Sequence, residues 1–138
     1  LTKAGKDGNK PIGALETIDY QFGLFANMPE GEQVKMVEQL LDEIDEMGPM
    51  FARMDEHWTT GDAEGFAKLM NDMNAQSPAQ YKILISDRNA NWAKWVDERL
   101  DKPGTVFVGV GAGHLGGKDS VQDLLTKRGI KATRVAAE

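Results

Sequence analysis

The sequence predicts a mixed α/β domain whose middle is mainly helical and whose sheet is small and parallel. The segment 105–110 is a run of β-branched and aromatic residues with apolar side chains at consecutive positions, which is typical of a strand covered on both faces. The segment is followed by a glycine loop at 111–117, a predicted helix at 119–128 and an apolar stretch at 130–135. This order is typical of a parallel unit with a crossover helix. A short apolar stretch at 11–15 predicts a third strand. The 138 residues are enough for a single domain over 1–138.

The composition argues against several classes of protein. With 22 acidic and 16 basic residues the net charge is -6, which disfavours a surface for nucleic acid or anionic membrane. The sequence has no cysteine, so it holds no disulfide, no thiolate metal site and no cysteine nucleophile. No apolar run approaches the roughly 18 residues of a membrane span. Because the sequence starts at Leu1 rather than at an initiator Met, we expect it to be a processed or excised piece.

Four helical stretches are predicted between the strands at 11–15 and 105–110, and three of them precede residue 77. The first follows Glu16 directly, which places this acid at a strand-to-helix corner where it also suits the helix dipole. A break at 27–29 starts a long amphipathic helix with a solvated acidic face, interrupted at Gly48 and Pro49 because proline removes a backbone donor. The third helix follows a turn and cap at 59–62. The apolar stripes are Ile18, Phe22 and Phe25; Val34, Val37, Leu40, Leu41, Ile44, Met47, Phe51 and Met54; and Phe66, Leu69, Met70 and Met73.

The helix predicted over 78–100 carries two polar residues on or beside its buried face. A capping box at 77–80 starts it. Arg88 fills a gap in its apolar stripe, and Asn89 borders the same face, so we expect something polar or anionic to meet them. A salt bridge with Asp87 or with a helix end, or an arginine that reaches the rim, would also explain Arg88. The stripe consists of Tyr81, Leu84, Ile85, Trp92, Trp95 and Val96.

Residues 111–116 match the pattern G-x-G-x-x-G between a strand and a helix, which is also the pattern of dinucleotide sites. In that interpretation the backbone at Gly111 and Gly113 would hold a phosphate, and Glu138 lies near the place of a ribose-binding acid. This nucleotide-binding alternative is the weaker one, because a dinucleotide half-site needs further parallel strands and because phosphate binding leaves His114 unexplained. A last helix is predicted over 119–128, with Gly129 at its left-handed end.

Glu16 and His114 both come directly after predicted strands. In an open parallel sheet, ligands gather outside the carboxyl ends of the strands, so we expect this carboxylate and this imidazole to converge there, with Arg88 and Asn89 beside them. A carboxylate and an imidazole together suit a divalent transition metal, and an arginine suits a polarised carbonyl or an anion. Two ligands leave such a site incomplete. His57 has no partner at metal-ligand spacing, so we expect a surface or packing role for it.

At these residues the sequence resembles the TraB/GumN family, which also includes PrgY and the Tiki proteins and is related to ChaN-like and erythromycin-esterase-like folds. The matching pieces occur in the family's order and cover most of the sequence from about residue 11 onward. They are Gly13-Ala-Leu-Glu-Thr17 with Gln21 downstream, Arg88-Asn89 followed by Trp92, and the glycine and histidine block at 107–116 followed by Leu124, Leu125 and Gly129.

The resemblance implies a mixed α/β domain and, for the Tiki branch, a metal-dependent peptidase with two G-x-x-H motifs and an acidic residue. The segment 111–114 matches the second motif through His114, and Glu16 matches the family's acid. The first motif is absent, so the resemblance implies that the sequence is the C-terminal part of such a domain, without its N-terminal half, and holds half a site. It also implies a peptide or small-molecule substrate and an exported location, periplasmic or lipid-anchored, with membrane association only through a missing N-terminal segment.

The leading hypothesis is therefore a metal-dependent, peptidase-like hydrolase. Glu16 and His114 would bind a divalent ion (Mn, Co or Zn) or act as acid and base, while Arg88 and Asn89 organise the site. The alternative is a non-catalytic protein that binds a small anion, a metal or a haem-like ligand at the same edge, and the third hypothesis is a nucleotide-binding fragment. An exposed edge of a truncated sheet would also favour a homo-oligomer.

Overall fold

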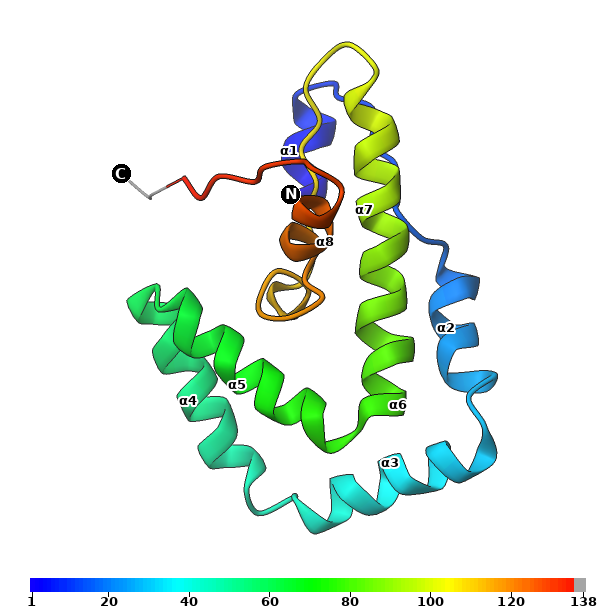
Figure 1. Cartoon of the computed structure of the whole chain (residues 1–138), viewed down its shortest axis with the longest axis vertical. Helices are drawn as coiled ribbons and strands as arrows, with labels where there is room; N and C mark the ends of the chain where they lie inside the picture. Colours follow the sequence, from blue (N-terminus) through cyan, green and yellow to red (C-terminus); the bar gives the residue numbers. More distant parts are fainter. Residues whose placement is uncertain (136–138) are drawn as a thin grey trace.

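The computed structural model describes residues 1–135, except the side chain of Asn74, and this part of the protein is helical (Figure 1). One turn of π-helix, Lys82–Ser86, joins α6 to α7, and one turn of 3-10 helix, Ala112–His114, precedes α8. The α-helices are α1 (Thr2–Asp7), α2 (Ile18–Ala26), α3 (Glu30–Asp42), α4 (Met47–Thr60), α5 (Ala63–Gln76), α6 (Pro78–Tyr81), α7 (Asp87–Leu100) and α8 (Val121–Lys127).

The prediction of an α/β fold with a parallel sheet is wrong, because residues 1–135 contain no strand. The segments 11–15, 105–110 and 130–135 are irregular, and no backbone hydrogen bond joins any two of them. A strand needs a neighbouring strand to satisfy its N–H and C=O groups, and these segments do not lie in register with one another. Segment 105–110 consequently keeps apolar side chains in solvent, with Phe107 77% exposed. Glu138, the predicted ribose-binding acid, lies outside the described residues.

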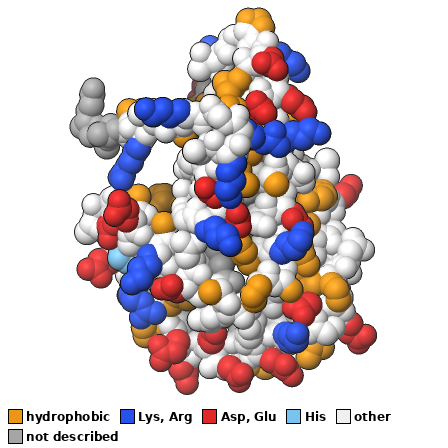
Figure 2. Space-filling view, in the orientation of Figure 1, with side chains coloured by type: hydrophobic (Ala, Val, Ile, Leu, Met, Phe, Trp, Pro, Cys, Tyr) orange, Lys and Arg blue, Asp and Glu red, His pale blue; other side chains and the backbone are white. Residues whose placement is uncertain are grey.

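The predicted long helix is two helices, and the break lies earlier than expected. α3 ends at Asp42 and α4 begins at Met47, so Gly48 and Pro49 lie in the first turn of α4 rather than at a kink. Proline is tolerated there because the first N–H groups of a helix have no partner within the helix. The apolar stripes of α2 and α3 are largely exposed, and Figure 2 shows apolar side chains on the surface over α2.

The α4–α5 turn and the start of α6 are both fixed by polar side chains. Asp62 caps α5 by accepting a hydrogen bond from the Gly65 backbone N–H at 2.9 Å, as the predicted cap at 59–62 requires. The predicted capping box at 77–80 does not form. The hydroxyl of Ser77 instead donates to the Gln39 side chain of α3 at 2.8 Å, and the Gln80 amide donates to the same oxygen at 3.2 Å.

α7 is the helix against which α8, the linker before α2 and the loop before α8 pack (Figure 1). α8 packs against it, α2 lies along its other side, and α5 lies beyond the loop that precedes α8. The small core sits here. Its buried apolar residues include Trp92 and Ala93 on α7 and Leu125 on α8, and the buried polar residues are Asn89, His114 and Ser120.

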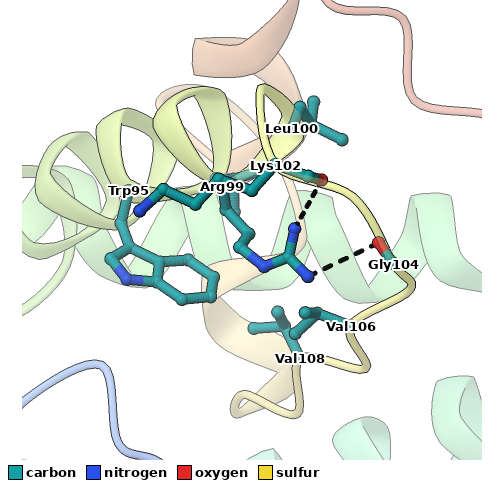
Figure 3. A pocket seen from close by; sticks show the side chains of 8 residues that line it. Trp95, Arg99, Leu100, Lys102, Gly104, Val106 and Val108 are labelled. Atoms are coloured by element: carbon teal, nitrogen blue, oxygen red, sulfur yellow. Dashed lines mark hydrogen bonds between the residues drawn. The ribbon is translucent and has the colours of Figure 1, made fainter.

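The turn after α7 sends the backbone back along that helix. The guanidinium group of Arg99 donates to the Lys102 carbonyl at 2.8 Å and to the Gly104 carbonyl at 3.4 Å, as Figure 3 shows. Val106 and Val108 then pass beside Trp95 and leave a shallow cavity of about 130 Å³. This return places the glycine loop next to the first two turns of α7. Among the described residues, no helix is both long and apolar enough to cross a membrane.

Candidate functional site

The structure brings the four predicted site residues together around α7, although no sheet positions them. Arg88 and Asn89 are consecutive on this helix and point to different partners. Arg88 meets Glu16, which comes from the linker before α2, and Asn89 meets His114, which comes from the 3-10 turn of the glycine loop. Two contact pairs, each linking residues far apart in the sequence, thus lie side by side on one helix.

Glu16 and Arg88 form a bidentate ion pair. Arg88 Nη2 lies 2.8 Å from Glu16 Oε2, and Arg88 Nε lies 2.9 Å from Glu16 Oε1. The Glu16 side chain is only 6% exposed and that of Arg88 16%. Gln21 donates to the same carboxylate at 3.1 Å. Arg88 therefore has the anionic partner that its position predicts, whereas Asp87 pairs with Lys82 instead.

The π-helical turn before α7 also orients the arginine. Arg88 Nη1 donates to the backbone carbonyl of Leu84, inside the π-turn, at 3.0 Å. This hydrogen bond ties the guanidinium group to the turn that precedes α7. Turns of this kind are frequent at functional sites.

The ion pair keeps Glu16 charged. Burial of the carboxyl group raises its pKa, but hydrogen bonds from Arg88 and Gln21 together with the positive charge of Arg88 outweigh burial, so that the pKa lies below its usual value. Both carboxylate oxygens are already occupied by Arg88. A metal ion at Glu16 would therefore have to compete with Arg88 for these oxygens.

Asn89 fixes the orientation and the tautomer of His114. Asn89 is fully buried, and its Nδ2 donates to the carbonyl of Asp119 at 2.8 Å, so its Oδ1 faces His114 Nδ1 at 2.7 Å. Because an amide oxygen only accepts, His114 Nδ1 carries the proton and Nε2 keeps its lone pair. No described residue forms a hydrogen bond with Nε2. His114 thus presents an oriented basic nitrogen.

The surroundings of His114 keep its ring neutral. The residue is 8% exposed, and burial lowers its pKa below 6.5, as does the positive charge of Arg88, while Glu16 acts in the opposite direction. Trp92 packs against the ring with its centroid at 4.5 Å. The neutral imidazole is the form that binds metals or accepts protons.

Trp92 joins the two pairs, although the sequence analysis places it in the apolar stripe and in the family match and not among the site residues. The Arg88 guanidinium carbon lies 5.0 Å from the centre of its ring, a cation–π distance. Its buried Nε1 forms no hydrogen bond of good geometry among the described residues, but it lies near enough to Glu16 to help lower the pKa of that carboxyl group. The signal in the sequence is the spacing, because Trp92 follows Arg88 by four residues and Asn89 by three, which puts all three on one helical face.

The glycines of the loop allow it to approach α5 closely. A Cβ at Gly113 would lie 3.1 Å from the end of Met70, and one at Gly116 would lie 3.1 Å from Ala67. Gly117 has a positive φ of 76°, and a Cβ there would collide with the Asn71 side chain. Met70 therefore occupies the space beside Gly113 in which the nucleotide interpretation places a phosphate.

The described residues fit a metal only in part. No group of three or more His, Cys, Asp or Glu residues lies close enough together within the described part of the protein to hold an ion. His114 suits one coordination position, since Asn89 orients it as outer partners orient metal-bound histidines. Glu16 would have to leave Arg88 to become a second ligand.

His114 makes the free energy of unfolding depend on pH. A pKa that is lowered in the folded state means that the unfolded protein binds more protons, so this contribution is complete above pH 6.5 and is lost as the pH falls through the folded-state pKa. We expect urea unfolding to show stability that falls as the pH drops below about 6.5, and His114→Gln to flatten that slope. Asn71→Leu, which changes a non-titrating side chain packed against the same loop, is the matched control and should keep it. An unchanged slope in His114→Gln would show that the pH dependence does not come from a lowered pKa of His114.

Three comparisons place the sequence among known proteins. A family model described as TraB/PrgY/gumN family matches residues 1–134. No curated protein and no solved structure matches the sequence. The family match covers every residue of the candidate site.

Proposed function

The chain belongs to the TraB/PrgY/gumN family, and we propose that it supplies His114 to a metal-assisted hydrolytic site that acts on peptide or amide bonds. The observation that carries this proposal is the hydrogen bond between Asn89 and His114, which leaves Nε2 unprotonated in a largely buried imidazole. A neutral, oriented imidazole is suited to hold a metal ion or to accept a proton from water.

In this proposal the other site residues position His114 and the substrate. Asn89 holds the tautomer. The guanidinium group of Arg88, kept in place by Glu16 and by the Leu84 carbonyl, favours the neutral form of His114 and offers positive charge to a carbonyl oxygen. A divalent ion such as Mn, Co or Zn, when bound, would polarise the scissile carbonyl and lower the pKa of water.

Thermal unfolding with added metal tests this proposal. A ligand that binds only the folded protein stabilises it by about 2.7 kcal/mol at a hundredfold excess over Kd, so Mn, Co or Zn should raise the Tm by several degrees. We expect His114→Ala to abolish the rise and chelator to reverse it in the wild type. His57→Ala, which changes the other histidine, should retain it.

Two outcomes would refute the metal assignment. The first is a wild-type Tm that none of the three metals changes. The second is a rise of equal size in the wild type and in His114→Ala, which would place the ion elsewhere. If a metal binds, hydrolysis of a peptide library by the metal-loaded protein is the next measurement, and a Glu16→Gln variant then shows whether the carboxylate contributes to turnover.

A further inference from the structure

A second cavity lies on the other side of the loop that carries His114. It is an open hollow of about 260 Å³ that lies between three segments surrounding one region in Figure 1: the turn between α4 and α5, the glycine loop, and the C-terminal segment. The residues that line it are His57, Trp58, Gly61, Asp62, Ala63, Phe66, Ala112, Leu115, Gly116 and Arg134.

The inner surface of this cavity is aromatic and apolar. Trp58 and Phe66 pack edge to face with ring centroids 6.4 Å apart, and Leu115 faces them from the loop. Trp58 remains 67% exposed although it is the largest side chain there. A cavity of about 150 Å³ lined by apolar side chains holds benzene, so 260 Å³ accommodates an aromatic ring with the atoms that attach it to a peptide backbone.

The rim of the cavity carries a donor and an acceptor in fixed positions. Arg134 Nη2 donates to the Gly61 carbonyl at 3.1 Å, and the guanidinium group has further N–H donors. Asp62 Oδ2 lies 3.0 Å from His57 Nδ1. The Gly65 backbone N–H, before any other group, holds the pKa of Asp62 below its usual value, so this residue is a carboxylate. A residue larger than glycine at Gly65 would collide with both His57 and Asp62. The observed arrangement of this pair therefore requires glycine at this position.

We propose that this cavity binds an aromatic side chain of a peptide, whose backbone carbonyl and N–H groups meet Arg134 and Asp62. The apolar floor matches the ring, and a rim with one donor and one acceptor matches a peptide group better than it matches a free anion or a free cation. The site is distinct from the Glu16, Arg88, Asn89 and His114 cluster but shares its loop.

The shared loop gives the cavity a place in the proposed reaction. Leu115 lines the cavity and directly follows His114, and consecutive Cα atoms are about 3.8 Å apart. A peptide anchored by its aromatic side chain therefore passes next to the loop whose histidine faces α7. Resting on the proposed function, this makes the cavity a specificity pocket that selects peptides with an aromatic residue near the cleaved bond.

Binding of a small probe to the whole protein tests the pocket without requiring turnover. The probe is N-acetylphenylalaninamide, and N-acetylalaninamide is its matched control. The protein has three tryptophans, so the indole N–H signals are few enough to assign. We expect the phenylalanine probe to shift the Trp58 signal saturably while the Trp95 signal stays in place, and the alanine probe to shift neither.

Two variants change the pocket and one leaves it intact. Ala112→Leu fills the cavity and should abolish the shift, and Leu115→Ala removes part of the floor and should weaken binding at least about fivefold. Phe107→Ala truncates an exposed apolar side chain outside the cavity and should bind as the wild type does. The proposal is overturned if the wild type shows no saturable shift, or if both pocket variants bind the probe as tightly as the wild type does.

The test separates this inference from the proposed hydrolysis. A protein that binds the probe in the pocket but cleaves no peptide would keep the pocket and reject the proposed function. A protein that cleaves peptides with no preference for aromatic residues, and shows no shift at Trp58, would reject the pocket alone.

Discussion

Replacing Arg88 by methionine should lower the free energy of unfolding by about 3 kcal/mol or more, because removing one partner of a buried ion pair leaves the other charge buried without compensation. The Glu16 carboxylate is the charge left behind, and its side chain is 6% exposed. The variant also loses the hydrogen bond to the Leu84 carbonyl and the cation–π contact with Trp92. Urea unfolding measures the effect as a lower midpoint at an unchanged m-value.

A second, exposed ion pair provides the matched control. Arg128 and Asp97 lie 2.9 Å apart with side chains 38% and 43% exposed. Because exposed pairs contribute only about 0–1 kcal/mol, Arg128→Met should be close to neutral. The double variant Glu16→Gln with Arg88→Met should recover much of the loss, since no buried charge remains. A loss below about 1 kcal/mol in Arg88→Met alone would show that water reaches Glu16.

The contacts of Arg88 also show what the sequence could predict. A helical stripe interrupted by arginine predicts a buried cation and therefore an anionic partner, because burial without one is costly. The sequence also predicts Glu16 nearby, but for the wrong reason. The predicted meeting place is the edge of a parallel sheet, whereas the structure uses the linker before α2, which Thr17 anchors by capping that helix. The contact between Glu16 and Arg88 could thus be predicted from the sequence, whereas the scaffold that brings them together could not.

The missing sheet has a specific cause. The run at 105–110 has the composition of a strand, but a strand exists only where a second segment accepts its hydrogen bonds, and that pairing is not encoded within the run. Here the turn fastened by Arg99 returns the segment along α7 instead. Helices are predicted better because their hydrogen bonds are local, and the stripes of α5 and α7 correspond to observed helices.

The backbone freedom of the glycine loop serves a contact that the sequence does not reveal. The pattern of glycines predicts close approach of something to the backbone but not what approaches. In the structure, Ala67 and Met70 of α5 do so next to Gly116 and Gly113. The π-turn at Lys82–Ser86 and the use of Ser77 across to α3 likewise depend on partners from other elements. Such features lie beyond any local pattern.

Replacing Asn89 by leucine should have the largest effect on the chemistry of His114. The side chain is fully buried, and its amide bonds both the His114 ring and the Asp119 carbonyl. Leucine has a similar volume but leaves the two groups without partners, at a cost of about 1–3 kcal/mol each. We therefore expect a loss of several kcal/mol in unfolding free energy together with a loss of any metal binding that depends on His114.

Nitrogen NMR of the His114 ring separates the chemical effect from the structural one. The wild type should show the tautomer with the proton on Nδ1, because Asn89 Oδ1 accepts it at 2.7 Å. Asn89→Leu should move the ring toward the other tautomer, which predominates in free imidazole side chains. Asn71 is the matched control, since it accepts a longer bond of 3.3 Å from the Lys118 backbone N–H in the same loop, and Asn71→Leu should leave the tautomer unchanged. A wild-type ring protonated on Nε2 would remove the basis for His114 as a base or a metal ligand through that nitrogen, because the lone pair would then face Asn89.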